Sequence, residues 1–159
     1  MPNVRRGLRT WGDNKSVRLR GFDYSQHEPY HIIVRTRPDT RPFADRAFAE
    51  HSCTTLTTLL VKLDAYLGCF CLMPDHLHLL FSPDRSELTV GSIVGRYKGL
   101  TTAASWKHGL SGRLWQTRFY DHIVRMSENV RKVAQYIYEN PERRGLPAEY
   151  PFRWIDPAL

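Results

Sequence analysis

YLGCFCLMPDHLHLLF, residues 66–81, is the segment with the clearest structural signal in the sequence. Residues 66–72 are mostly apolar and aromatic, which is typical of a strand, and residues 76–81 have the same character. Between them stands Met-Pro-Asp, residues 73–75, a composition that favours a turn. The segment therefore predicts a β-hairpin in which His76 begins the returning strand.

Apolar spacing on both sides of this hairpin predicts the other elements. Helices are indicated where apolar side chains recur at three and four residues, and strands where β-branched or aromatic residues cluster between turn residues. The predicted strands are residues 30–37 and 115–124, and the predicted helices are residues 43–63, 88–108 and 127–140. This order predicts an α+β domain in which helices pack on an antiparallel sheet.

The chain is strongly basic, with 23 Lys and Arg against 16 Asp and Glu and a net charge of +7. Six Lys or Arg and one Asp in residues 1–20 contribute +5 of that charge. Such a balance is typical of proteins that bind a polyanion. We expect a basic arm, residues 1–28, and a folded domain, residues 29–159. The arm either contacts nucleic acid, through Arg5, Arg6 and Arg9, or is a solvated tail.

Cellular location follows from what the sequence lacks. It contains no run of eighteen apolar residues and no apolar secretory signal near Met1, so we expect a soluble, cytoplasmic protein without a membrane partner. Its cysteines are Cys53, Cys69 and Cys71. An odd number without an export signal indicates reduced thiols and not a disulfide framework.

His76 and His78 are the first candidates for chemistry, because alternate residues of a strand project from the same face. Two imidazoles so placed can hold one metal ion. In a chain with 7 histidines the pattern also arises readily by chance, so ordinary strand histidines are the alternative. Cys69 and Cys71, on the paired strand, add the alternative of a closed Cys2His2 zinc site, unless they simply face the core.

Tyr136 and Asn140 are the second candidates, within QYIYENP at residues 135–141. Residues four apart lie on one side of a helix, whereas Tyr138 would point about 160° away from Tyr136. Only one of the two tyrosines can therefore share a site with Asn140. The alternative is that Tyr136 flanks the core and that Asn140 turns the chain before Pro141.

Three segments together resemble the signature segments of the REP-associated tyrosine transposases. They are MPDHLHLLF (73–81), LWQTRFYDHIVR (114–125) and YIYENPERRGL (136–146). That family belongs to the His-hydrophobic-His, or HUH, superfamily of single-strand endonucleases, and the resemblance implies their ferredoxin-like, RRM-like palm as the fold. Matched by position, His76 and His78 are the metal-binding pair, Tyr136 is the nucleophile and Asn140 is a third metal ligand. Glu142 departs from the small apolar residue that is more usual after Asn-Pro.

The resemblance implies an enzyme that cuts and rejoins single-stranded DNA through a 5′-phosphotyrosine, with Mg²⁺ or Mn²⁺ as cofactor. A cation on the non-bridging oxygens would let a tyrosine approach the shielded phosphodiester. The targets it implies include hairpin or palindromic repeat elements, and the protein would act as a monomer or homodimer. The alternatives are a non-catalytic single-stranded DNA- or RNA-binding module on the same fold, and a metal hydrolase that releases free phosphate ends.

Aromatic and basic side chains provide candidate contacts to a single strand, which needs stacking surfaces as well as positive charge. For the aromatic residues the alternative is a place in the core, and for the basic residues it is a solvated surface. His122 could orient a ligand, contact a phosphate or form an interior hydrogen bond. The candidate DNA contacts of the folded domain are Arg96, Lys98, Trp115, Arg118, Arg125, Arg143 and Arg144.

Overall fold

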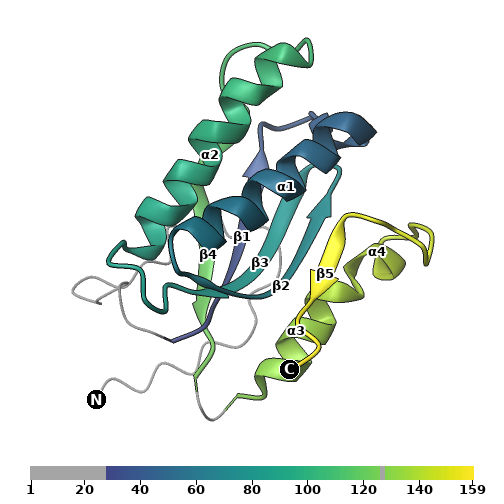
Figure 1. The fold of residues 1–159 in the computed structure, drawn as a ribbon. Helices are drawn as coiled ribbons and strands as arrows, with labels where there is room; N and C mark the ends of the chain where they lie inside the picture. Colours follow the sequence, from purple (N-terminus) through teal and green to yellow (C-terminus); the bar gives the residue numbers. More distant parts are fainter. Residues whose placement is uncertain (1–27, 126–127) are drawn as a thin grey trace.

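A central sheet organises the chain, with helices on both of its faces (Figure 1). The computed structural model describes residues 28–125 and 128–159. In chain order its elements are β1 (Tyr30–Thr36), the 3₁₀ helix η1 (Pro42–Ala44), α1 (Arg46–Lys62), β2 (Tyr66–Met73), β3 (His76–Ser82), α2 (Val90–Lys107), β4 (Trp115–Ile123), α3 (Val130–Tyr138), α4 (Asn140–Arg143) and β5 (Arg153–Ile155). The predicted hairpin, strands and long helices are present, and η1, α4 and β5 are additions.

The five strands lie in the order β4-β1-β3-β2-β5, and every neighbouring pair is antiparallel. The predicted hairpin is the pair β2–β3, with Met73 opposite His76 and Cys71 opposite His78. Because β1 joins the other side of β3, β3 lies in the middle of the sheet and all of its residues are buried. The expected α+β fold with an antiparallel sheet is confirmed.

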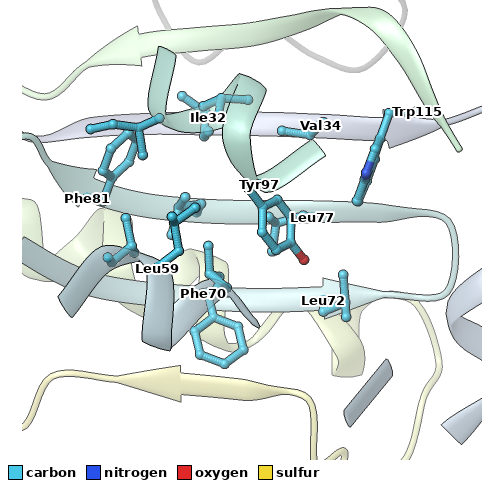
Figure 2. Packing of buried hydrophobic residues seen from close by; sticks show 14 of the residues in the cluster. Ile32, Val34, Leu59, Phe70, Leu72, Leu77, Phe81, Tyr97 and Trp115 are labelled. Carbon is cyan, nitrogen blue, oxygen red and sulfur yellow. The ribbon is translucent and has the colours of Figure 1, made fainter. Parts of the chain in front are cut away.

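Different helices cover the two faces of the sheet (Figure 1). On one face α1 and α2 enclose the larger core, in which Ile32, Leu77 and Phe81 pack with Tyr97 (Figure 2). On the other face α3 lies over β2 and β3 and encloses a smaller core. The smaller core consists of Cys69, Cys71, Met73, Leu80, Val124, Val133, Ala134 and Ile137. Since successive strand residues point to opposite faces, β3 supplies side chains to both.

Helix boundaries differ from the predicted ones where a capping residue intervenes. α1 begins at Arg46, because the Asp45 side chain accepts a hydrogen bond from the Phe48 backbone N–H at 3.1 Å and so caps the helix there. α3 is capped by Asn129, and Ser127, the predicted start, lies outside the described residues. α3 ends at Tyr138, before Pro141, which takes one of the first two positions of the short helix α4 that follows.

Two predictions from the sequence concern the basic arm and membrane-spanning helices. Glu28 is the first described residue, so Arg5, Arg6 and Arg9 of the predicted arm lie outside the described residues. In the described ranges, no helix has the length and apolar character needed to cross a membrane.

Trp115 is not a DNA contact, which corrects the prediction from sequence. Its side chain is only 1% exposed and packs against Phe43 and Tyr97, with ring centroids 5.3 and 5.9 Å away. The indole Nε1 donates a hydrogen bond to Thr101 Oγ1 at 2.8 Å. Trp115 begins β4 on the face that α2 covers, so it belongs to the larger core (Figure 2).

Trp115→Ala should lower the free energy of unfolding by about 3–5 kcal/mol, because it opens a cavity between the sheet and α2. Trp106→Ala is the matched control, since Trp106 on α2 is 56% exposed. We expect the control to cost about 1 kcal/mol or less. Urea denaturation followed by circular dichroism measures both. Equal losses in the two variants would show that Trp115 is not a core residue.

Candidate functional site

His76 and His78 lie next to each other on the face of β3 that points away from α1 and α2. Leu77 and Leu79 alternate with them and enter the larger core, which sends the imidazoles to the opposite face. The two rings are 5.0 Å apart between centroids, and the residues are 3% and 2% exposed. The predicted strand pair is therefore formed, and it is more deeply buried than an ordinary surface pair.

The helices α3 and α4 bring Asn140 to this pair. α3 docks through Val133, Ala134 and Ile137, and the backbone carbonyl of Ala134 accepts a hydrogen bond from Cys69 Sγ at 3.3 Å. At the start of α4, the side-chain nitrogen of Asn140 lies 3.0 Å from His78 Nε2. The structure thus joins the two groups of candidates that the sequence could only place separately.

Arg153 fixes α4 to the edge of the sheet, and sequence reasoning did not find it. From β5 its guanidinium donates to both carboxylate oxygens of Glu142, at 2.9 and 2.8 Å, and to the backbone carbonyls of Tyr138 at 2.6 Å and Ala148. Glu142, the departure from the family pattern, is therefore a tether between α4 and β5. Because Glu142 and Asn140 both belong to α4, this tether also restrains Asn140.

The two tyrosines of this segment have different surroundings. Tyr136 is 36% exposed, and the Arg143 guanidinium lies 4.3 Å from its ring centroid. Arg143 is in turn held by the Glu139 carboxylate at 3.3 Å. Tyr138 packs against the smaller core, with Arg153 4.3 Å from its ring. Of the two, Tyr136 is the one open to a substrate.

A third buried histidine, His31 on β1, touches the pair, and the sequence analysis overlooked it. Its Nε2 lies 3.2 Å from His78 Nδ1, and the two rings stack with centroids 5.5 Å apart. Burial, and then the charge of His122, lowers the pKa of His31 to about 3. Burial, followed by the charges of His31 and His76, holds the pKa of His78 well below its usual value. Both rings are therefore neutral at pH 7, the form in which imidazole binds a metal.

The donor set fits a divalent metal ion. Asp75 Oδ1 lies 2.6 Å from His76 Nδ1, and His31 occupies the Nδ1 side of His78, so Nε2 would be the metal-binding nitrogen of each ring. In the described ranges, His, Cys, Asp and Glu alone form no group of three that could hold a metal. A centre here would therefore need the amide oxygen of Asn140 as third ligand, and two nitrogens with one oxygen leave coordination positions open.

The cysteine pair does not complete a zinc site. Cys69 Sγ contacts the Ala134 carbonyl, and Cys71 Sγ lies 3.6 Å from the sulfur of Met73. Burial raises the pKa of the Cys69 thiol to about 12 and that of Cys71 further, which opposes the thiolate form that zinc requires. Both thiols belong to the smaller core, so the core-facing interpretation accounts for them.

The basic candidates fall into two groups. Arg143 and Arg144 are exposed on α4, and Arg144 is close enough for its charge to lower the pKa of His78. Arg118 lies on the same face of β4 as His122. The backbone of His122 pairs with that of His31, and His122 Nε2 lies 2.8 Å from Glu128 Oε2. His122 thus forms a partly buried hydrogen bond, which is one of the alternatives that the sequence left open. Arg125 is exposed just after β4.

The other two basic candidates, Arg96 and Lys98, lie on α2, across the sheet from the histidines (Figure 1). Lys98 Nζ donates to the backbone carbonyls of Gln116 and Thr117 at 2.6 and 3.3 Å, so it binds the edge strand β4. The structure does not bring these two residues to the candidate site.

Known proteins share both the sequence pattern and the fold. An uncharacterised protein of Haemophilus influenzae is 32% identical over 72 residues, which is 45% of this chain and 40% of that protein. The REP-associated tyrosine transposase of Escherichia coli K12 is 25% identical over 79 residues, 50% of this chain and 46% of that protein. The matched region therefore covers less than half of the length of either relative.

A solved structure of a REP-associated tyrosine transposase bound to a REP hairpin has the same fold. It superposes with a TM-score of 0.68 at 20% identity, over 86% of this chain and 81% of the other. The pattern of the family described as "Transposase IS200 like" matches residues 25–140, a range that includes the histidine pair, Tyr136 and Asn140. The chain belongs to the IS200-like transposase family.

Proposed function

We propose that this chain is a metal-dependent single-stranded DNA endonuclease and strand transferase that works through Tyr136. The observation that carries the proposal is the 3.0 Å contact between Asn140 and His78 Nε2. It joins a buried histidine pair on the sheet to the helix segment that bears an exposed tyrosine. A fold that only bound nucleic acid would have no need of this buried polar junction.

The roles follow from the donor types and from exposure. His76, His78 and Asn140 would hold Mg²⁺ or Mn²⁺, which when bound supplies positive charge to the non-bridging oxygens of a phosphodiester. Tyr136 Oη attacks the phosphorus and forms an O–P bond, while the bond from phosphorus to the 3′ oxygen breaks. The phenolic proton passes to a base, and the 3′ oxygen takes up a proton and leaves as a hydroxyl. Attack by a new 3′ hydroxyl on the phosphotyrosine reverses these changes and rejoins the strand without ATP.

The proposed substrate is single-stranded DNA that carries hairpin-forming repeats. Support comes from the solved relative, which is bound to a REP hairpin, and from the basic balance of this chain. On the side of the sheet that holds the histidines, Arg118, Arg143 and Arg144 are exposed and available to phosphates. We also propose that the protein acts as a monomer or a homodimer.

Tyr136→Phe should bind single-stranded DNA normally and form no covalent protein–DNA adduct, because only the attacking hydroxyl is removed. Tyr138→Phe is the matched control and should still form the adduct. A denaturing gel with a labelled oligonucleotide and Mn²⁺ separates the outcomes. Adducts that survive in Tyr136→Phe and vanish in Tyr138→Phe would contradict the assignment of the nucleophile. Cleavage without an adduct in the unmodified protein would favour a metal hydrolase.

His76→Gln and His78→Gln should each abolish measurable Mn²⁺ binding, because each removes a ligand and leaves too few to hold the ion. Glutamine replaces the rings with a side chain of similar polarity, which suits positions that are 3% and 2% exposed. His108→Gln, an exposed histidine after α2, is the control. Calorimetric titration gives the affinities, and circular dichroism shows that the variants fold. Folded variants with wild-type Mn²⁺ affinity would refute the metal site.

Arg144→Ala should weaken DNA binding and reduce the slope of log affinity against log salt by about one unit, because one phosphate contact is lost. Arg96→Ala is the matched control, since Arg96 is also an exposed arginine but lies on the α2 side of the sheet. Salt-titrated fluorescence anisotropy on a labelled oligonucleotide measures both slopes. The reverse ranking would indicate that DNA binds over α2.

A further inference from the structure

His31 is a buried polar residue for which the proposed reaction has no role. It is 1% exposed in the middle of the sheet, where its backbone pairs with Leu80 of β3 and His122 of β4 and its ring contacts His78. Its neighbours on β1, Ile32 and Val34, belong to the larger core, so His31 points to the face that carries the histidine pair. Burial of an imidazole costs free energy unless its nitrogens are hydrogen bonded.

The hydrogen bonds around His78 determine which of its nitrogens carries the proton. The side-chain nitrogen of Asn140 can only donate, so His78 Nε2, 3.0 Å away, must accept. A neutral imidazole then holds its proton on Nδ1. That N–H donates to His31 Nε2 at 3.2 Å, and His31 in turn carries its own proton on Nδ1.

This arrangement costs free energy at His31, the last residue in the series of hydrogen bonds. Within the described ranges, His31 Nδ1 is buried and has no hydrogen-bond partner. An apolar side chain at position 31 would avoid that cost and would fit a sheet face that already includes Cys71 and Leu80. The contact with His78 offsets part of that cost.

We propose that His31 is a positioning residue: by accepting from Nδ1–H it acts together with the Asn140 amide to hold His78 in the Nδ1-protonated tautomer, which keeps on Nε2 a lone pair that a metal could bind. The metal part of this inference rests on the proposed function, and the tautomer part does not. Asp75 does the same for His76 with a carboxylate. His31 orients His78 with a neutral acceptor, and therefore adds no negative charge where a phosphodiester has to approach.

Nitrogen-15 NMR of the metal-free full chain tests the tautomer directly, because protonated and unprotonated ring nitrogens have distinct shifts. The His78 signals are assigned by their loss in His78→Gln. We expect Nδ1–H in the wild type and an increased share of Nε2–H in His31→Leu. His31→Gln, which can place a carbonyl oxygen near Nδ1, should restore the wild-type tautomer.

Calorimetric titration with Mn²⁺ tests the consequence. His31→Leu should lose about 10–100-fold in affinity, and His31→Gln should recover most of it, which a purely structural role would not predict. An Nε2–H tautomer in the wild type would overturn the inference, and so would a folded His31→Leu with unchanged affinity. If His31→Leu fails to fold, the wild-type spectrum and His31→Gln still decide. A wild type that keeps Nδ1–H but binds no Mn²⁺ would refute the proposed metal function and leave the tautomer assignment standing.

Discussion

Strand β3 has to satisfy two environments within the same seven residues. Strand geometry sends Leu77 and Leu79 into the core under α1 and α2, and this burial fixes the direction in which His76 and His78 must point. A slip of one residue in register would turn the histidines into the apolar core under α1 and α2 and would turn the leucines to the opposite face of the sheet. The position of the candidate site thus depends on the hydrophobic packing behind it.

The second requirement is that a helix from the end of the chain reaches this face. α3 docks through a stripe of small and branched side chains, and Arg153 then ties α4 to β5 through Glu142. As a result, the two candidate residues of this segment differ in exposure. Asn140 is buried and held against His78, whereas Tyr136 stays exposed one turn earlier. Such a combination suits an enzyme that needs a fixed ligand and an accessible nucleophile.

Local patterns in the sequence predicted the hairpin, the pairing of His76 with His78 and the helix that bears Tyr136, because each of these depends on residues close together in the chain. They misjudged Trp115, since an aromatic strand does not reveal which face a helix will cover. They also missed His31 and Arg153. His31 meets His78 only through the order of the strands, and β5, with three residues, is too short to produce a periodic signal.

The approach of Asn140 to His78 is another contact that periodicity could not supply, because it joins elements 62 residues apart. The resemblance to known transposases implied it before the fold did. Burial of the pair was the unexpected part, and for His78 it lowers the pKa and so favours the neutral imidazole, the form that can bind a metal.

Peptide mapping by tandem mass spectrometry can identify the residue that attacks the DNA. The wild-type protein would be incubated with Mn²⁺ and a single-stranded oligonucleotide that carries a repeat hairpin, then digested with nuclease and protease. We expect a nucleotide attached through phosphate to Tyr136, together with a free 3′ hydroxyl on the released strand. A nucleotide on any other residue, or cleaved DNA with free 5′ phosphates and unmodified peptides, would contradict this expectation.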